Sequence, residues 1–321
     1  MPTLADVFVA QKVIRPYLKP TPLLDSELLS DRFGCRILIK CENLNPTGAF
    51  KIRGGINLLS RFGPEQRALG VVAASTGNHG QSIAYAARLF GIQATIFVPL
   101  QSNPMKVASM KRLGAQVISE GDGFDEAFRA AELFATDSGA HFVHSANEPD
   151  LIAGVGTYVL EILQDEPEID ALFVPIGAGS GACGACVAGK GIRPQLQVIG
   201  VQAEGAPSVY DSWQARTLGE IAVADTFAEG IATRRSFELP AAILWDTVDD
   251  IMLVSDAELR HSIVTLLEAT HMVAEGAGAA ALAGAWKRRN DFSGKTIAVV
   301  LSGGNLTSDA LVQALTEERF L

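Results

Sequence analysis

The sequence predicts an α/β protein with two domains, in which mostly parallel sheets are flanked by helices. Short apolar runs rich in valine and isoleucine alternate with longer segments of helical period. Most of these runs end at a glycine or a polar turn, as buried strands do before a helix. The chain has 321 residues, of which 48% are hydrophobic, so it is long and apolar enough to form more than one core.

Eight apolar runs are predicted to be strands. In chain order they are residues 37–41, 71–75, 94–98, 116–119, 141–144, 171–175, 197–201 and 296–301. Four segments between them have the apolar spacing of amphipathic helices, namely residues 81–90, 105–113, 124–136 and 259–271. Compact strand–helix units in the first half predict a small domain, residues 65–145, inserted in a large discontinuous domain of residues 1–64 and 146–321.

Composition argues against several classes of partner. The 26 basic and 36 acidic residues give a net charge of −10, so no general attraction to nucleic acid or to an anionic membrane is expected. We predict no secretory signal, and no apolar run reaches the ~18 residues that a membrane span needs. The four cysteines lack the paired spacing of a disulfide framework, which favours a reducing cytoplasm.

Lys51 is the first candidate for chemistry. It follows Phe50 in a turn of small residues and precedes an apolar helical pattern. A lysine amine becomes a nucleophile toward carbonyl groups when desolvation or a cationic neighbour lowers its pKa, and it then forms Schiff bases. A solvated lysine in the first turn of a helix is the alternative, and Lys51 taken alone does not decide between them.

The turn after the strand at residues 71–75 is a candidate binding site, because parallel sheets place ligands at the carboxyl ends of their strands. It contains Ser75, Thr76, Gly77, Asn78 and His79. Hydroxyl groups, an amide and backbone N–H groups at the start of a helix can receive a carboxylate or an oxyanion. Ordinary capping of the helix by Thr76 or Asn78 is the alternative.

A glycine-rich turn follows the strand at residues 171–175. It consists of Gly177, Ala178, Gly179, Ser180 and Gly181. Several N–H groups can converge there on one phosphate. Together with Gly184 the turn also satisfies G-x-G-x-x-G, and Glu204 lies about 20 residues beyond, so a dinucleotide site is an alternative for this segment alone.

A third turn, at Ser302, also follows an apolar strand and offers a hydroxyl beside two glycines. A plain turn before a helix is the alternative.

One ligand accounts for Lys51 and all three turns, because pyridoxal 5′-phosphate has an aldehyde, a phosphate and a ring nitrogen. Each of these groups would then have a receiver in the chain.

The chain resembles the fold type II pyridoxal-phosphate enzymes, and within them the serine/threonine dehydratase and serine racemase family. Residues 40–54 are similar to the family's cofactor-lysine motif, residues 75–79 to its substrate-carboxylate loop and residues 177–181 to its phosphate loop. Residues 227–232, 275–279 and 302–305 match further elements in the family's order. The similarity spans nearly the whole chain.

The resemblance implies a role for each candidate. Lys51 would form a Schiff base with the cofactor and remove the α-proton of the substrate, and Phe50 would stack on the pyridine ring. Asn78 would meet the 3′-oxygen of the cofactor, and Ser302 its ring nitrogen. The remaining expected contacts are the turn at residues 177–181 with the phosphate, Gly230 and Glu275 with the cofactor, and Ser75, Thr76, Gly77, Asn78 and His79 with the substrate.

The implied reaction is β-elimination from a β-hydroxy amino acid such as L-threonine or L-serine, which gives a 2-oxo acid and ammonia. A neutral hydroxyl at the ring nitrogen does not hold the pyridine protonated, which favours elimination over transamination. Racemization remains an alternative, because Thr76 would lie opposite Lys51 and could reprotonate the α-carbon. Serine, threonine, 3-hydroxyaspartate and β-phenylserine all remain open as substrates.

A bound cation is left open. Gln202, Ala206 and Ser208 fall at the ligand positions of the racemase's divalent-ion site, where a carboxylate is missing, and Glu204 could supply one in a shifted register. We also expect a homodimer or homotetramer. Since the chain ends soon after the Ser302 turn, we expect no appended regulatory domain and a catabolic role.

Overall fold

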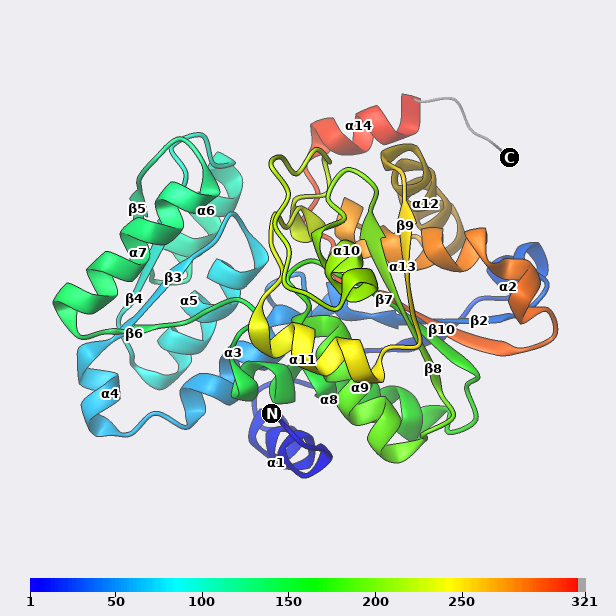
Figure 1. Ribbon diagram of the computed structural model, residues 1–321, viewed down its shortest axis with the longest axis horizontal. Helices are drawn as coiled ribbons and strands as arrows, with labels where there is room; N and C mark the ends of the chain where they lie inside the picture. The colour runs from blue at the N-terminus through cyan, green and yellow to red at the C-terminus, as the bar shows by residue number, and fades with distance from the viewer. Residues whose placement is uncertain (317–321) are drawn as a thin grey trace.

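The computed structural model describes residues 1–316, which form two lobes, each built around its own sheet (Figure 1). The larger sheet has six strands in the order β1-β2-β10-β7-β8-β9, and the smaller has four in the order β5-β4-β3-β6. The strands of the smaller sheet all come from residues 71–142, whereas the larger sheet draws its strands from both sides of that segment. The α/β class with parallel sheets is therefore confirmed.

The strands of the larger sheet are β1 (Leu23–Asp25), β2 (Arg36–Cys41), β7 (Ala171–Pro175), β8 (Gln197–Ala203), β9 (Asp250–Val254) and β10 (Thr296–Leu301). Those of the smaller sheet are β3 (Val71–Ala74), β4 (Ala94–Val98), β5 (Gln116–Ser119) and β6 (His141–Phe142). Only β1 pairs antiparallel with its neighbour among these ten strands. All eight predicted strands are present, and the prediction missed β1 and β9, which are both edge strands.

The helices of the described residues are α1 (Leu4–Ile14), α2 (Glu27–Phe33), α3 (Lys51–Ser60), α4 (Pro64–Leu69), α5 (Asn78–Phe90), α6 (Pro104–Arg112), α7 (Phe124–Ser138), α8 (Pro149–Asp165), α9 (Ser180–Ile192), α10 (Ser208–Ala215), α11 (Glu238–Thr247), α12 (Asp256–Thr270), α13 (Gly276–Lys287) and α14 (Ser308–Thr316). Three short 3₁₀ turns are η1 (Glu42–Leu44), η2 (Glu229–Ile231) and η3 (Arg289–Phe292). The four predicted helices are present, and α5 begins three residues earlier than predicted. None of the helices in residues 1–316 combines the length and the apolar character that a membrane crossing requires.

Both faces of the larger sheet are covered, which explains its nearly continuous apolar strands. Along β10, Ala298 and Val300 join the core shared with α1, α3, α8 and α9, whereas Ile297, Val299 and Leu301 join the core shared with α2, α12 and α13. Successive side chains point to opposite faces because a strand has a period of two. Every residue of β10 after the first is therefore buried.

A buried cluster of charges joins β2, α3 and α8. The guanidinium of Arg53 makes paired contacts with both Glu42, at 2.7 and 2.8 Å, and Glu161, at 2.6 and 2.8 Å. Lys40 Nζ adds a third cation–carboxylate contact to Glu161 at 2.6 Å, and Thr21 Oγ1 donates to Glu42 at 2.6 Å. Two positive and two negative charges thus compensate one another out of contact with water.

The cluster gives Arg53 a structural role. Burial alone would raise the pKa of Glu42, but the neighbouring Arg53 guanidinium lowers it below its ordinary value. Glu42 therefore remains ionised at neutral pH. Arg53 in turn anchors the first turn of α3, which begins at Lys51.

Replacing Arg53 tests this anchoring. We expect Arg53→Met to lower the free energy of unfolding by about 3–5 kcal/mol at pH 7, because it leaves the buried Glu42 carboxylate without its cation and Glu161 with Lys40 alone. The stabilisation is present above the ordinary carboxyl pKa range and is lost as the pH falls through the lowered pKa of Glu42. Urea unfolding followed by circular dichroism measures both effects.

The matched control is Arg36→Met, which removes the ion pairs of the half-exposed Arg36 with Asp25 and Glu166. An exposed pair contributes less than about 1 kcal/mol. Equal losses in the two variants would contradict the structural role of Arg53.

Candidate active site

Lys51 lies at the start of α3, at the carboxyl edge of the larger sheet. Its Nζ donates hydrogen bonds to the Ser180 hydroxyl at 2.7 Å and to the Ser145 carbonyl at 2.9 Å. Burial lowers the pKa of this amine from 10.5 to about 8. Lys51 is only partly buried, so its amine is both desolvated and within reach of a ligand.

Phe50 connects Lys51 with the Ser302 turn. The Phe50 backbone N–H donates to the Ser302 carbonyl at 3.0 Å, immediately after β10 ends. The Lys51 ammonium lies 5.4 Å from the centre of the Phe50 ring. Ser302 is buried, and its hydroxyl donates a weak hydrogen bond of 3.3 Å to the Ala277 carbonyl.

The glycine turn forms the N-terminus of α9, beside Lys51. Gly179 precedes the helix with a φ of +102°, a conformation that L side chains rarely adopt. A side chain at Gly177 would collide with the carbonyl oxygen of Gly230, and a Cβ placed on Gly181 would lie 3.4 Å from the Phe50 ring. The free N–H groups of the first helical turn, together with the Ser180 hydroxyl, form a site suited to an anion.

The turn after β3 is held by Ser75 and not by the predicted capping residues. The Ser75 hydroxyl accepts hydrogen bonds from the backbone of Gly77 at 3.0 Å and of Gly80 at 2.8 Å. The Thr76 hydroxyl makes no hydrogen bond within residues 1–316 and is partly exposed. The Thr76 hydroxyl is therefore available to bind a ligand, whereas the Ser75 hydroxyl is already hydrogen-bonded to two backbone N–H groups.

His79 is a buried, neutral residue. Its Nε2 pairs with the Val143 carbonyl at 3.1 Å. Burial lowers its pKa to about 3, and the Lys51 charge acts in the same direction. These contacts support a structural role for His79 at the start of α5.

Asn78 belongs to a hydrogen-bonded chain between the lobes. Its amide donates to Glu275 at 2.6 Å and accepts from Asn305 at 2.7 Å, and Asn305 also donates to the Thr47 carbonyl at 2.9 Å. Burial raises the pKa of Glu275, while Lys106 and the Asn78 hydrogen bond oppose that rise. The chain places α5, α13 and the Ser302 turn around one space.

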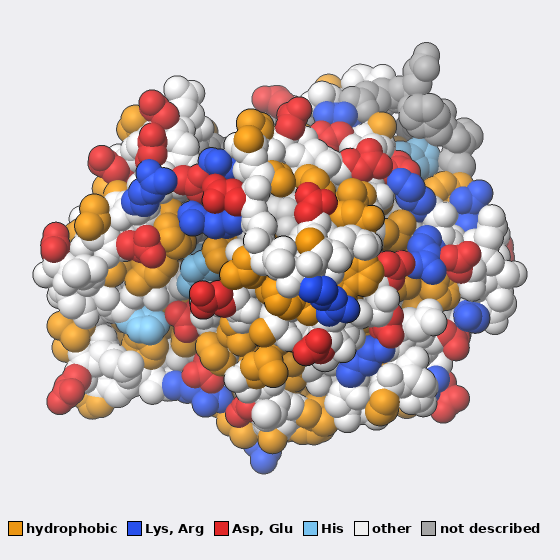
Figure 2. Space-filling view, in the orientation of Figure 1, with side chains coloured by type: hydrophobic (Ala, Val, Ile, Leu, Met, Phe, Trp, Pro, Cys, Tyr) orange, Lys and Arg blue, Asp and Glu red, His pale blue; other side chains and the backbone are white. Residues whose placement is uncertain are grey.

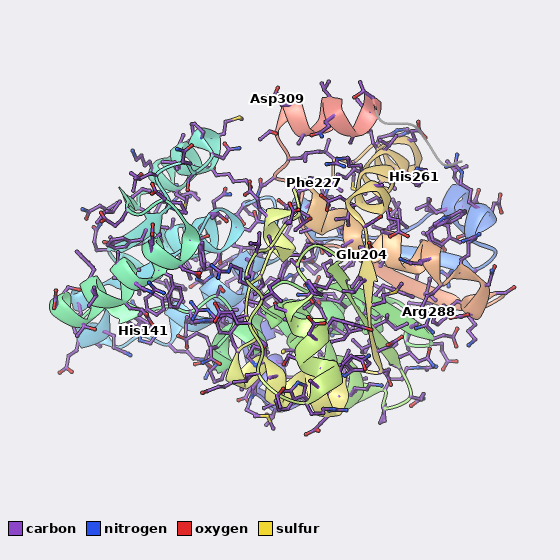
Figure 3. The ribbon with its side chains drawn as sticks, turned by 45° about the horizontal axis from the view of Figure 1, so that its top comes forward. His141, Glu204, Phe227, His261, Arg288 and Asp309 are labelled. Carbon is purple, nitrogen blue, oxygen red and sulfur yellow. The ribbon has the colours of Figure 1, made fainter. Side chains whose placement is uncertain are left out.

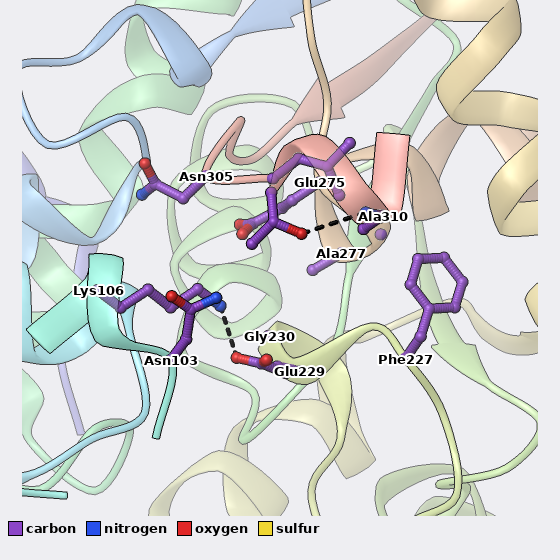
Figure 4. Close-up of a pocket in the computed structure, with 12 residues that line it drawn as sticks. Asn103, Lys106, Phe227, Glu229, Gly230, Glu275, Ala277, Asn305 and Ala310 are labelled. Atoms are coloured by element: carbon purple, nitrogen blue, oxygen red, sulfur yellow. Dashed lines mark hydrogen bonds and ion pairs between the residues drawn. The ribbon is translucent and has the colours of Figure 1, made fainter. Parts of the chain in front are cut away.

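A pocket of about 110 Å³ opens beside this chain (Figure 4). Its lining includes Lys106, Glu229, Gly230, Glu275 and Asn305. The predictions included Gly230 and Glu275, but assigned no role to Lys106, Glu229 or Asn305. Asn305 belongs to the predicted segment 302–305 and Glu229 to the segment 227–232, so both lay beside predicted residues, whereas Lys106 lies in the predicted helix 105–113, which carries no turn signal.

Comparison with known proteins agrees with this geometry. The family model described as pyridoxal-phosphate dependent enzyme matches residues 14–303. The chain belongs to this family. The match covers all three turns and Lys51, whereas the dinucleotide alternative accounts for one turn only.

Relatives of this pyridoxal-phosphate-dependent enzyme include ammonia-lyases. An L-threonine ammonia-lyase of Thermotoga maritima is 42% identical over 95% of this chain and 76% of its own length. An L-threo-3-hydroxyaspartate ammonia-lyase of Saccharomyces cerevisiae is 35% identical over 95% of this chain and 94% of its own length.

Solved structures show the same fold. Threonine deaminase isoform 2 of Solanum lycopersicum has a TM-score of 0.93 at 29% identity and covers 98% of this chain and 90% of its own. Maize serine racemase has a TM-score of 0.91 at 30% identity and covers 98% of this chain and 97% of its own. The resemblance to fold type II enzymes is therefore confirmed.

The donor set fits pyridoxal phosphate. The Lys51 amine is desolvated and suited to an aldehyde, and the N-terminus of α9 beside it is suited to a phosphate. Gly177 and Gly179 leave the space that a Cβ would fill. Ser302, which supplies a neutral hydroxyl, directly follows β10, and its main-chain carbonyl accepts from the Phe50 N–H.

The positions proposed for a cation fit less well. Gln202 is fully buried, and its side-chain oxygen accepts hydrogen bonds from the backbone of Val209 at 3.2 Å and Tyr210 at 2.9 Å, in the first turn of α10. Glu204 (Figure 3) is half exposed, and its carboxylate pairs with Lys287 at 3.5 Å. Hard cations prefer several oxygen ligands that include carboxylates, which these residues do not supply.

A charge at position 202 tests that interpretation. We expect Gln202→Glu to make stability depend on Mg²⁺ or Ca²⁺, because a buried carboxylate at this position needs a cation beside it. Differential scanning fluorimetry with and without EDTA should show a cation-dependent rise in Tm for this variant. Gln197→Glu, at the exposed start of the same strand, is the control, and a similar rise in the unaltered protein would contradict the prediction.

The lowered pKa of Lys51 predicts how the cofactor-free protein reacts with pyridoxal phosphate. The unprotonated amine is the nucleophile, so the rate of Schiff-base formation should rise with pH to a midpoint near 8, and not near the ordinary 10.5. The growth of an absorption band at about 410–420 nm follows the reaction. Lys51→Ala should show no band, and a midpoint at the ordinary lysine pKa would refute the desolvation of Lys51.

Proposed function

We propose that this enzyme catalyses β-elimination from a β-hydroxy amino acid such as L-threonine or L-serine, releasing a 2-oxo acid and ammonia. The observation that carries the proposal is the desolvated amine of Lys51, held beside the N-terminus of α9 and next to Phe50, whose N–H donates to the main-chain carbonyl of Ser302. The names of the relatives in Thermotoga maritima and Saccharomyces cerevisiae support the same reaction class.

The cofactor contacts follow from this arrangement. We propose that Lys51 would hold the cofactor at its aldehyde and that residues 177–181 would hold its phosphate. Ser302 would meet the ring nitrogen, and Asn78 the ring oxygen, with Phe50, Gly230 and Glu275 beside the ring. When bound, pyridoxal phosphate withdraws electrons from the α-carbon of the substrate.

The chain itself supplies proton transfer and substrate orientation. Lys51 Nζ would take the α-proton, the Cβ–O bond would break, and the hydroxyl would depart as water with a proton returned from Lys51 Nζ. Addition of water to the unsaturated product then gives the 2-oxo acid and ammonia. We assign the substrate carboxylate to the Thr76 hydroxyl and the N-terminus of α5, with Ser75, Gly77 and His79 shaping the loop.

Racemization is the second candidate function. The observation that favours it is the unpaired hydroxyl of Thr76, which can carry a proton, and the structural likeness to maize serine racemase agrees with it. The two functions are separated by chiral chromatography, because a racemase forms the D-amino acid from the L-isomer without releasing ammonia.

We further propose a cytoplasmic homodimer or homotetramer, with a small domain at residues 65–145. The four cysteines are buried and unpaired within the described structure, which supports a reducing compartment. The small sheet lies between residues 71 and 142, which supports the domain boundaries. Gel filtration with light scattering tests the assembly.

The activity itself is tested with a panel of amino acids. We expect ammonia and a 2-oxo acid from at least one of L-serine, L-threonine, threo- and erythro-3-hydroxyaspartate and β-phenylserine. Lys51→Ala should lower kcat by about 10²–10⁴-fold, the usual contribution of a general base, whereas Lys12→Ala, on α1, serves as the control. No ammonia from any member of the panel would refute β-elimination.

A further inference from the structure

Lys106 lies directly over the loop to which we assign the substrate carboxylate. It is on α6, and its side chain is only 14% exposed although it ends in a charge. A Cβ placed on Gly77 would lie 3.3 Å from Lys106 Cδ and 3.6 Å from its Nζ. The ammonium group is therefore held against the backbone of the loop, and the proposed reaction gives it no role.

Glu229 holds this ammonium from the opposite lobe. Its carboxylate lies 2.5 Å from Lys106 Nζ, and it belongs to η2, next to Gly230 (Figure 4). Glu229 is half exposed, whereas Lys106 is nearly covered. The ion pair crosses between the lobes, where Figure 2 shows a notch bordered by basic and acidic side chains.

Lys106 is the charge that allows the pocket to accept an anionic ligand. Among the described residues that line it, Lys106 is the only one with a positive charge, and it faces the two carboxyl groups of Glu229 and Glu275. An amino acid that enters this pocket brings a carboxylate of its own. Without the lysine, that carboxylate would meet acidic groups in a space of reduced dielectric constant.

We propose that Lys106 binds the substrate, its ammonium receiving the α-carboxylate of the amino acid at the Gly77 loop in exchange for part of its contact with Glu229. Charge-assisted hydrogen bonds to carboxylates are strong enough for this role. The inference rests on the proposed function only for the identity of the ligand, an amino acid. Glu229 then acts as a competitor that holds Lys106 in place before the substrate arrives.

A purely structural ion pair between the lobes would behave differently. If Lys106 and Glu229 served only each other, removal of either one would have the same effect, and removal of both would be no worse than either. If Lys106 binds the substrate, its loss weakens binding, whereas loss of Glu229 frees the lysine and strengthens binding. The two cases therefore predict opposite signs for the Glu229 variant.

The experiment compares Lys106→Met, Lys106→Arg, Glu229→Gln and the double variant Lys106→Met/Glu229→Gln in the holoenzyme. We expect Lys106→Met to raise KM by about tenfold or more with a smaller change in kcat, and Lys106→Arg to recover most of that loss. Glu229→Gln should lower KM, and the double variant should keep a raised KM. Lys111→Met, an exposed lysine on the same helix, is the matched control for helix and charge effects.

A KM unchanged by Lys106→Met would overturn the inference. A Glu229→Gln variant whose KM rises as much as that of Lys106→Met would overturn it too. A double variant with the natural KM would do so too, because Lys106 would then only neutralise Glu229. Calorimetric titration with L-alanine, which has no β-hydroxyl to eliminate, separates this inference from the reaction. Binding of L-alanine that weakens in Lys106→Met supports the inference even if no panel member releases ammonia.

Discussion

The position of the reactive lysine depends on a cluster of buried charges below it. Arg53 reaches from the first turn of α3 to Glu42 after β2 and to Glu161 on α8, 108 positions away, so three elements share one cation. A buried charge leaves its partners only at a high cost in free energy. The start of α3, and Lys51 with it, is therefore set against the sheet edge before any ligand binds.

The fold and the centre of the site could be read from local patterns. Buried parallel strands leave continuous apolar runs, and the turns at Ser75, Gly177 and Ser302 follow such runs directly. The two missed strands gave weaker signals, since β1 has three residues and β9 is only partly buried. The strand propensity of the residues and their hydrophobic periodicity carry little information about segments this short or this exposed.

Other features could not be predicted, because they depend on residues that meet only in the folded chain. Lys106 and Glu229 are 123 positions apart, and no pattern near either one points to the other. The turn after β3 stays a predicted site, and the structure shows that the Ser75 hydroxyl, one residue before Thr76, accepts from two of its backbone N–H groups. Burial of His79 and Gln202 likewise follows from tertiary packing.

The hydrogen bond between Phe50 N–H and the Ser302 carbonyl has a consequence for how such an enzyme can diversify. It ties the strand end at Ser302 to the residue before Lys51 through main-chain atoms alone. The side chain at position 302 can therefore change while the spacing between the two positions is kept. Substitution at this one position can therefore change the chemical group that faces the site without moving the main chain that positions Lys51.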